Sequence, residues 1–456
     1  MVPPLTTSMK PTSTNSQVKG SSRCAPDAER WRFWAIAGFC LLASLTLSLG
    51  CAAVPGIDHA RNGHFAEFRK AERSSKQDYS KGQLRRLARA VLSGEVKRAS
   101  DREDRPFVAS LVDCGRPVAR ALRSRSQQDD GVGAEAAMVL LESGRLGDRP
   151  KKYATDQDGG RRALAARASK RRGAARRAFF VDPDERVRRA ALRAALDAQD
   201  AADASNLLEV ARLDPDGTSR QVAIFALANF GGNDLVEALW DRFEGADESL
   251  RRTIVEAWGK QDLYRSGGQE RLARVIAQRH GLASVEAAAI LSRDPQVSVK
   301  NSGLTRLLRF SREGSSKERI QAISSLSLAD EGVVPLLLEL SEDDATEVAL
   351  AANARLLDSP SKQKAAEKRL LAAAKEENPH AVTARAWLAA AGRKSVHALL
   401  LKQAKSKDGQ HRLAAAKGLL QLQASSELIP LLADPVPEVR RTLACEVLSK
   451  KGQAKK

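Results

Sequence analysis

The stretch "FFVDPDERVRRAALRAAL", residues 179–196, opens with an Asp-Pro pair and continues as an arginine-rich, helix-prone run. Similar surroundings follow three other Asp-Pro pairs, in "ARLDPDGTSRQVAIFALA", "LSRDPQVSVKNSGLTRLL" and "LLADPVPEVRRTLACEVL". The aspartates, each given with the basic residue six positions later, are Asp182 with Arg188, Asp214 with Arg220, Asp294 with Lys300, and Asp434 with Arg440. This recurrence indicates a repeated structural unit rather than one isolated arginine site.

The chemistry of helix ends explains the residues of the unit. Aspartate is a strong N-cap, because its carboxylate accepts hydrogen bonds from free backbone amides in the first helical turn. Proline suits the first helical position, where its missing amide costs nothing. We therefore expect Asp182 to cap a helix that starts at Pro183, with Glu185 completing a capping box. Val187 and Ala190 then lie on one apolar face of that helix.

Shorter apolar segments lie between the Asp-Pro copies, for example "ASNLLEVARL" and "EGVVPLLLEL". The period is about 30 residues, enough for two helices and two short turns. A unit of this size cannot bury its apolar stripe alone, so neighbouring units must stack to complete the core. Aromatic residues make up only 4% of the chain, and alanine-rich interiors suit closely packed helices. The predicted fold class is all-α, an α-solenoid of stacked antiparallel helix pairs.

These units resemble HEAT repeats, in the short form also seen in proteins of the phycobilisome-lyase type. The resemblance covers roughly residues 161–448. It implies that the basic residue at the sixth position joins adjacent repeats by pairing with acidic groups, a role for Arg188, Arg220, Lys300 and Arg440. The period is shorter than the roughly 40 residues of longer HEAT units, which leaves curvature and superhelical pitch open.

The N-terminal part of the chain has the pattern of a signal sequence or membrane anchor. The uncharged run "FWAIAGFCLLASLTLSLG", residues 33–50, follows a basic leader and precedes Cys51. It resembles a bacterial lipoprotein signal, which implies lipidation at Cys51, although Ser48 and Leu49 depart from the residues usual there. The alternative is an uncleaved single-pass anchor, because a helix over this run spans about 27 Å. Both interpretations place the rest of the chain at a membrane, and we expect it outside the cytoplasm.

Composition shifts divide the chain into five segments. Residues 1–51 form the signal or membrane anchor, 52–60 a tether, 61–160 a helical N-terminal region with room for degenerate repeats, 161–449 the solenoid, and 450–456 a basic tail.

A second cationic stretch, "RRALAARASKRRGAARR", covers residues 161–177 and contains no acidic residue. Its basic residues are Arg161, Arg162, Arg167, Lys170, Arg171, Arg172, Arg176 and Arg177. On a helix these charges point in all directions, which is not the pattern of a membrane-surface helix. The stretch is a candidate contact for phosphate groups of lipid or nucleic acid, or else a solvated hinge. No aromatic residue is interleaved for base stacking, which disfavours nucleic acid.

The remaining composition offers little chemistry. The five cysteines and six histidines show no CxxC pair and no zinc-type spacing, so we predict neither a disulfide framework nor a metal site. No P-loop, GxSxG or HExxH motif is present. The net charge of +19 is compatible with anionic partners, but a compositional bias toward arginine would produce it as well.

We therefore expect a membrane-anchored, non-catalytic scaffold without a cofactor, which binds other proteins through the solenoid surface. Binding of nucleic acid or anionic lipid through residues 161–177 is the alternative. A bilin-lyase-like enzyme is a further alternative, based only on shared repeats.

Overall fold

The computed structural model describes residues 54–74, 79–114, 118–146 and 152–449, which belong to one compact unit beginning at Val54. All regular structure in these ranges is helical and none of it is strand, which confirms the all-α prediction for them. Within the same ranges, no helix is both long enough and apolar enough to span a membrane. The run 33–50, Cys51 and the tail 450–456 lie outside the described residues.

Short helices follow one another along the whole unit. The N-terminal elements are α2 (Ile57–Arg61), α3 (Phe65–Ser74), α4 (Lys81–Asp101), α5 (Arg105–Ser110), η1 (Leu111–Cys114), α6 (Ala119–Leu122), η3 (Arg125–Gln127) and α7 (Gly131–Glu142). They continue with α8 (Gly159–Arg167), α9 (Gly173–Ala178), η5 (Phe179–Val181), α10 (Glu185–Ala198), η6 (Ala201–Asp203), α11 (Ala204–Leu213), α12 (Gly217–Leu227), α13 (Asn233–Glu244), α14 (Glu248–Trp258), α15 (Gln261–Leu263), η7 (Tyr264–Gly268) and α16 (Gln269–Gln278). The last are α17 (Gly281–Leu291), α18 (Val297–Glu313), α19 (Ser316–Ser325), α20 (Val333–Leu340), α21 (Thr346–Leu356), α22 (Gln363–Lys375), α23 (Pro379–Ala390), η8 (Lys394–Val396), α24 (His397–Gln403), α25 (Gly409–Gln421), η9 (Ser426–Leu428), α26 (Ile429–Leu432) and α27 (Pro437–Ser449).

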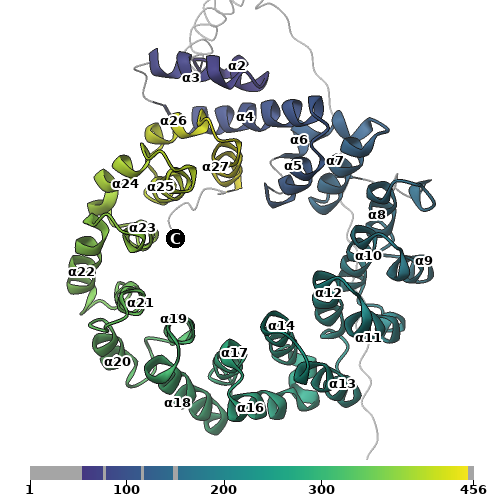
Figure 1. Cartoon of the computed structure of the whole chain (residues 1–456), viewed down its shortest axis with the longest axis vertical. Helices are drawn as coiled ribbons and strands as arrows, with labels where there is room; N and C mark the ends of the chain where they lie inside the picture. Colours follow the sequence, from purple (N-terminus) through teal and green to yellow (C-terminus); the bar gives the residue numbers. More distant parts are fainter. Residues whose placement is uncertain (1–53, 75–78, 115–117, 147–151, 450–456) are drawn as a thin grey trace, which may run out of the picture. The chain divides into compact units, whose positions relative to one another are not determined.

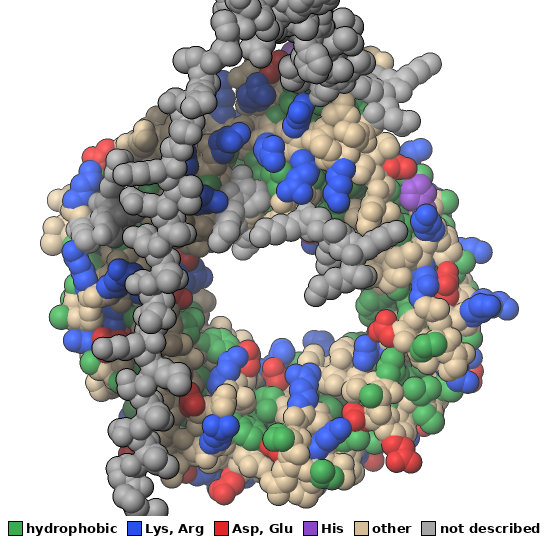
Figure 2. All heavy atoms as spheres, turned by 180° about the vertical axis from the view of Figure 1, so that it is seen from behind, with side chains coloured by type: hydrophobic (Ala, Val, Ile, Leu, Met, Phe, Trp, Pro, Cys, Tyr) green, Lys and Arg blue, Asp and Glu red, His purple; other side chains and the backbone are tan. Residues whose placement is uncertain are grey.

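Within this unit the helices form an inner and an outer row around a central opening (Figures 1 and 2). We call α10, α12, α14, α17, α19, α21, α23, α25 and α27 the inner row, because each of them contacts the next. Outer helices such as α11, α20 and α24 each pack against the inner helix that follows them. Gly160 lies within α8, which contacts both α7 and α10, so the helices before and after it continue the same arrangement.

One apolar core runs through the unit from Val54 to Leu448. Small and branched side chains fill it, as α10 illustrates: Val187, Ala191 and Leu192 are each 0% exposed. Alanine at such positions lets helix axes approach closely while keeping a high helix propensity.

The expected helix start at the Asp-Pro pair is wrong by two residues. Helix α10 is capped by Asp184, whose carboxylate accepts the amide of Arg186, while Asp182 and Pro183 lie in the preceding turn. Likewise α12 is capped by Asp216 rather than by Asp214. The carboxylate of Asp182 instead accepts the amide two residues on, which closes a tight turn before the helix begins.

The two ends of the helical series lie side by side (Figure 1). Helix α27 packs against α4 and against η1, and α26 contacts both α3 and α4. Arg85 donates a hydrogen bond to the carbonyl oxygen of Leu448 at 3.2 Å, and Arg441 donates one to the hydroxyl of Ser110 at 2.6 Å. The series of helices in this unit is therefore closed end to end.

A disulfide between Cys114 and Cys445 joins η1 to α27, with a Cα–Cα distance of 4.7 Å. The expectation that the cysteines form no disulfide framework is wrong at this pair. Spacing gave no warning, because the partners are 331 residues apart in sequence and meet only where the series closes.

We predict that the unreduced chain migrates faster on denaturing gels than the reduced chain, because the bond closes a loop of more than 300 residues. Cys445→Ser and Cys114→Ser should each abolish the difference. Recovery of Cys114 and Cys445 as free thiols after alkylation of the unreduced, denatured protein would contradict the bond.

Candidate functional site

The carboxylate of each Asp-Pro aspartate accepts hydrogen bonds both from a backbone amide of its own turn and from a side chain of a preceding helix. One carboxylate oxygen of Asp214 accepts the backbone amide of Asp216 at 2.8 Å, inside its own turn. The same carboxylate also accepts hydrogen bonds from Nε and Nη2 of Arg188, in the preceding helix pair, at 2.7 and 3.0 Å. Such a two-armed guanidinium–carboxylate contact is both strong and orientation-specific. The aspartate therefore connects the turn of one helix pair to the inner helix of the pair before it.

The basic residue at the sixth position adds a second link. One arm of Arg188 donates to the carbonyl oxygens of Asp182 and Pro183 at 2.8 and 3.1 Å, in its own turn. Arg188 thus spans from its own Asp-Pro turn to the next one. We call this series of contacts between successive Asp-Pro turns the arginine ladder.

Other copies of the unit repeat parts of the ladder. Arg162 holds Asp182 with two hydrogen bonds of 2.9 and 3.0 Å, and Arg412 holds Asp434 with two of 2.6 and 2.9 Å. The amides two residues after Asp294 and after Asp434 again bond to those carboxylates.

Three contacts, in the copies at Asp214 and Asp294, depart from the pattern. The hydroxyl of Tyr264 replaces an arginine on Asp294. Lys300 pairs with Asp330 at 3.0 Å. Arg220 donates only to the carbonyl oxygens of its own turn, Asp214 and Pro215. The ladder therefore has weaker and stronger steps along the unit.

The ladder changes the pKa values of its carboxyl groups. The hydrogen bond from Arg189 holds the pKa of Asp216 well below its ordinary value, with further lowering by Ser219. At Asp182 burial acts in the opposite direction, but the hydrogen bonds from Arg162 and from the Asp184 amide outweigh it and lower its pKa. These carboxylates are more stable as anions in the folded chain than in the unfolded chain.

At the last Asp-Pro turn the carboxylate comes from the N-terminal part of the helical unit. Arg440 donates to the carbonyl oxygens of Asp434 and Pro435 in its own turn and pairs with Glu95 of α4. The side chains of Arg440 and Glu95 are 1% and 4% exposed. Burial raises the pKa of Glu95, and the nearby Arg440 offsets part of that rise. Glu95 therefore occupies the place that the aspartate of a following Asp-Pro turn would take.

The basic stretch 161–177 is for the most part not a free cationic surface. Carboxylates pair with these five of its eight cations: Arg161 with Asp156, Arg162 with Asp182, Arg167 with Glu142 and Asp197, Arg176 with Asp200 and Asp203, and Arg177 with Asp203. Arg176 is 1% exposed and Asp203 is fully buried. Only Lys170, Arg171 and Arg172 are exposed, at the turn between α8 and α9. Most of the positive charges in this stretch are therefore already paired with carboxylates of other segments.

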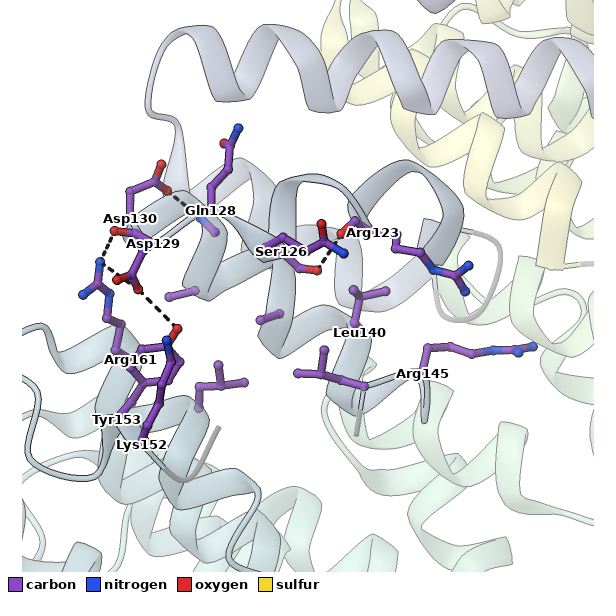
Figure 3. Close-up of a pocket in the computed structure, with 16 residues that line it drawn as sticks. Arg123, Ser126, Gln128, Asp129, Asp130, Leu140, Arg145, Lys152, Tyr153 and Arg161 are labelled. Carbon is purple, nitrogen blue, oxygen red and sulfur yellow. Dashed lines mark hydrogen bonds and ion pairs between the residues drawn. The ribbon is translucent and has the colours of Figure 1, made fainter. Parts of the chain in front are cut away.

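A cavity of about 570 Å³ lies between α7, α8 and the turn before α7 (Figure 3). Asp129, Tyr153 and Arg161 gather on one side of it, where the Tyr153 hydroxyl donates to Asp129 at 3.2 Å. Arg123 and Arg145 lie on the other side and extend away from these groups (Figure 3). The acidic side is already occupied by internal contacts. Among the described residues, no carboxylate pairs with Arg123 or Arg145.

The described residues contain no cluster of His, Cys, Asp or Glu suited to hold a metal ion. Cys51, the candidate lipid-attachment residue, is not among them. Trp258 is fully buried and Trp240 is 8% exposed, and the two rings stack with centroids 5.8 Å apart. These tryptophans belong to the core of the helix pairs.

The sequence did not predict the residues that close the series, namely Glu95, Cys114 and Cys445. Their contacts join segments more than 300 residues apart, and no local pattern marks such partners. A carboxylate in an otherwise apolar helical face, such as Glu95 in α4, was the one available signal, because buried acidic groups are almost always paired.

No protein-family model matches the chain, and no curated protein matches it either. The contacts within the chain are therefore the basis for a functional proposal.

We predict that Arg188→Gln lowers the free energy of unfolding by about 3–5 kcal/mol, because it leaves the buried Asp214 without its partner. The matched control is Arg193→Gln on the exposed side of the same helix, which should change stability by about 0.5 kcal/mol or less. Urea unfolding followed by circular dichroism measures both, and equal effects of the two substitutions would contradict the ladder.

We also predict how acid acts on the ladder. Because the pKa values of Asp182 and Asp216 are lowered in the folded chain, their contribution to stability is complete above about pH 4. It is lost as the pH falls through the lowered values. Asp216→Asn should destabilise the chain at pH 7, and its difference from the wild type should shrink below pH 4. Urea unfolding at several pH values tests this, and a difference that grows on acidification would refute it.

Proposed function

We propose that this chain is a membrane-tethered, non-catalytic scaffold built from HEAT-type repeats, which holds other proteins on the surface of its helical unit. The arginine ladder is the observation that carries the proposal. Each step uses residues from two successive helix pairs, so the contacts that stabilise the unit are contacts between repeats. Stability that depends on neighbouring repeats is the physical property of α-solenoids.

The arrangement of helices supports a binding role. Inner-row helices line a central opening, and a row of this kind presents many exposed side chains along one continuous surface (Figure 2). The cavities of the described residues hold no metal-binding cluster, and the buried charges belong to ion pairs between helices. Protein recognition over an extended surface needs no buried catalytic group.

The disulfide supports a location outside the cytoplasm. Bonds of this type persist in the periplasm and at cell surfaces, and they are rare in the reducing cytosol. Cys114 and Cys445 are 2% and 8% exposed, which suits a structural bond. This agrees with export directed by the run 33–50 and with attachment at Cys51. An uncleaved anchor in that run would give the same location.

The two alternative functions have less support. Binding of nucleic acid through residues 161–177 would need free cations, and carboxylates pair with most of them. A bilin-lyase-like activity rests on the shared repeats alone, and no described residue of this chain is a candidate to carry it.

Site-specific photo-crosslinking tests the scaffold. A photoreactive residue is placed at Glu256, an exposed position of inner helix α14. In intact cells it should give discrete adducts with one partner protein, and replicate experiments should give the same adducts. The control position is Glu209, which is exposed on outer helix α11 and should give none. Adducts from Glu209 alone, or from neither position, would contradict binding through the inner row.

The membrane tether makes a separate prediction. Wild-type chain should fractionate with membranes, and the mature N-terminus should be a Cys51 that carries lipid mass. Cys51→Ser should retain the leader and lose the lipid mass. A full-length chain that remains in the soluble fraction would overturn the proposed location.

A further inference from the structure

A second cavity, of about 370 Å³, lies beside the first and has a different character. Arg89, Arg120, Arg123 and Arg145 line it, together with Ser93 and small apolar residues of α4 and α6. The described residues that line it include no Asp or Glu. It shares Arg123 and Arg145 with the larger cavity, where both side chains extend away from the acidic groups (Figure 3).

Three separate elements bring these cations together. Arg89 lies on α4, Arg120 lies on α6, and α4 contacts α6. Arg145 follows α7, where Gly144 has a φ of +69° and the amide of Arg145 bonds back to the carbonyl oxygen of Leu140 at 2.8 Å. That left-handed turn is suited to glycine, and it places Arg145 beside the end of the helix.

The four guanidinium groups differ from the paired arginines of the rest of the unit. Arg188 of the ladder and Arg176 of the stretch 161–177 are buried and hold carboxylates. These four arginines are exposed, and no carboxylate pairs with them among the described residues. Four positive charges around one cavity repel one another, and an anion within it would remove that cost. Each guanidinium offers a planar fork of donors that matches the oxygens of a phosphate group.

The cationic surface continues along α4. Arg86 and Lys97 are also exposed, and their spacing of three and four residues from Arg89 and Ser93 places them on the same helical face. Figure 2 shows Lys and Arg side chains gathered in the region of α4, with few Asp or Glu among them.

We propose that the cavity lined by Arg89, Arg120, Arg123 and Arg145 is a binding site for a phosphate ester. Its volume exceeds that of inorganic phosphate and suits an organic phosphate the size of a lipid headgroup. The chemistry is common to an anionic phospholipid headgroup and to a soluble phosphate ester, and the experiment separates these sources. The site does not depend on the proposed scaffold function.

Titration of the purified full-length chain in neutral detergent tests the soluble source. Glycerol 3-phosphate should bind to the wild type, more weakly at 200 mM than at 50 mM salt, because the contacts are ionic. Arg120→Gln with Arg145→Gln should reduce affinity at least about tenfold, since two charge-assisted contacts are lost. The matched control is Arg171→Gln with Arg172→Gln, which removes the same charge from an exposed turn and should leave affinity within about twofold.

Native mass spectrometry of the same proteins, mixed with phosphatidylglycerol or phosphatidylcholine, tests the lipid source. Selective retention of phosphatidylglycerol by the wild type, lost in the Arg120 and Arg145 variant, supports the site and identifies the headgroup. Binding of glycerol 3-phosphate alone supports it with a soluble ligand. Faster migration on unreduced denaturing gels shows that a variant has formed the Cys114–Cys445 bond, and therefore that the two ends of its helical unit have met. Absence of both kinds of binding, or equal losses in the two double variants, would overturn the proposal.

Discussion

The fork between an arginine and an aspartate of the next helix pair is the interaction on which this structure depends. Arg188 shows its complete form, with one arm on its own Asp-Pro turn and two contacts on Asp214 of the next. A buried carboxylate and a buried guanidinium are costly separately, so each one requires the other to be in place. Because the partners belong to different helix pairs, each complete fork of this kind aligns one helix pair with the next.

The same interaction explains how the series ends. In an open series of such helix pairs the last arginine would have no following aspartate, and a buried unpaired guanidinium is strongly unfavourable. Here Glu95 of α4 supplies the carboxylate to Arg440, and the disulfide between Cys114 and Cys445 joins the same two regions. The unit therefore needs no polar terminal cap at the face between α4 and α27, since each end covers the other.

The features that the sequence alone could predict were those set by residues close together in the chain, and contacts between distant segments were missed. Periodicity over about 30 residues was sufficient for the helical class and for the recurrence of Asp182, Asp214, Asp294 and Asp434. The predicted start of α10 was wrong by two residues, because the carboxylate of Asp182 closes the turn and holds Arg162 instead of capping the helix. The charge of the stretch 161–177 was visible, but its carboxylate partners, such as Asp203, lie on other elements. Glu95, Cys445 and the four-arginine cavity depend on contacts that only the folded chain creates.

Closure between α4 and α27 is the central claim, and a distance measured in solution tests it most directly. Fluorescent labels introduced as non-natural residues at Arg86 on α4 and at Ser449 on α27 would report the separation of the two ends by energy transfer. Packed neighbouring helices predict a single short distance, on the order of 20 Å. A long or broad distribution, as an open row of repeats would give, would contradict the account.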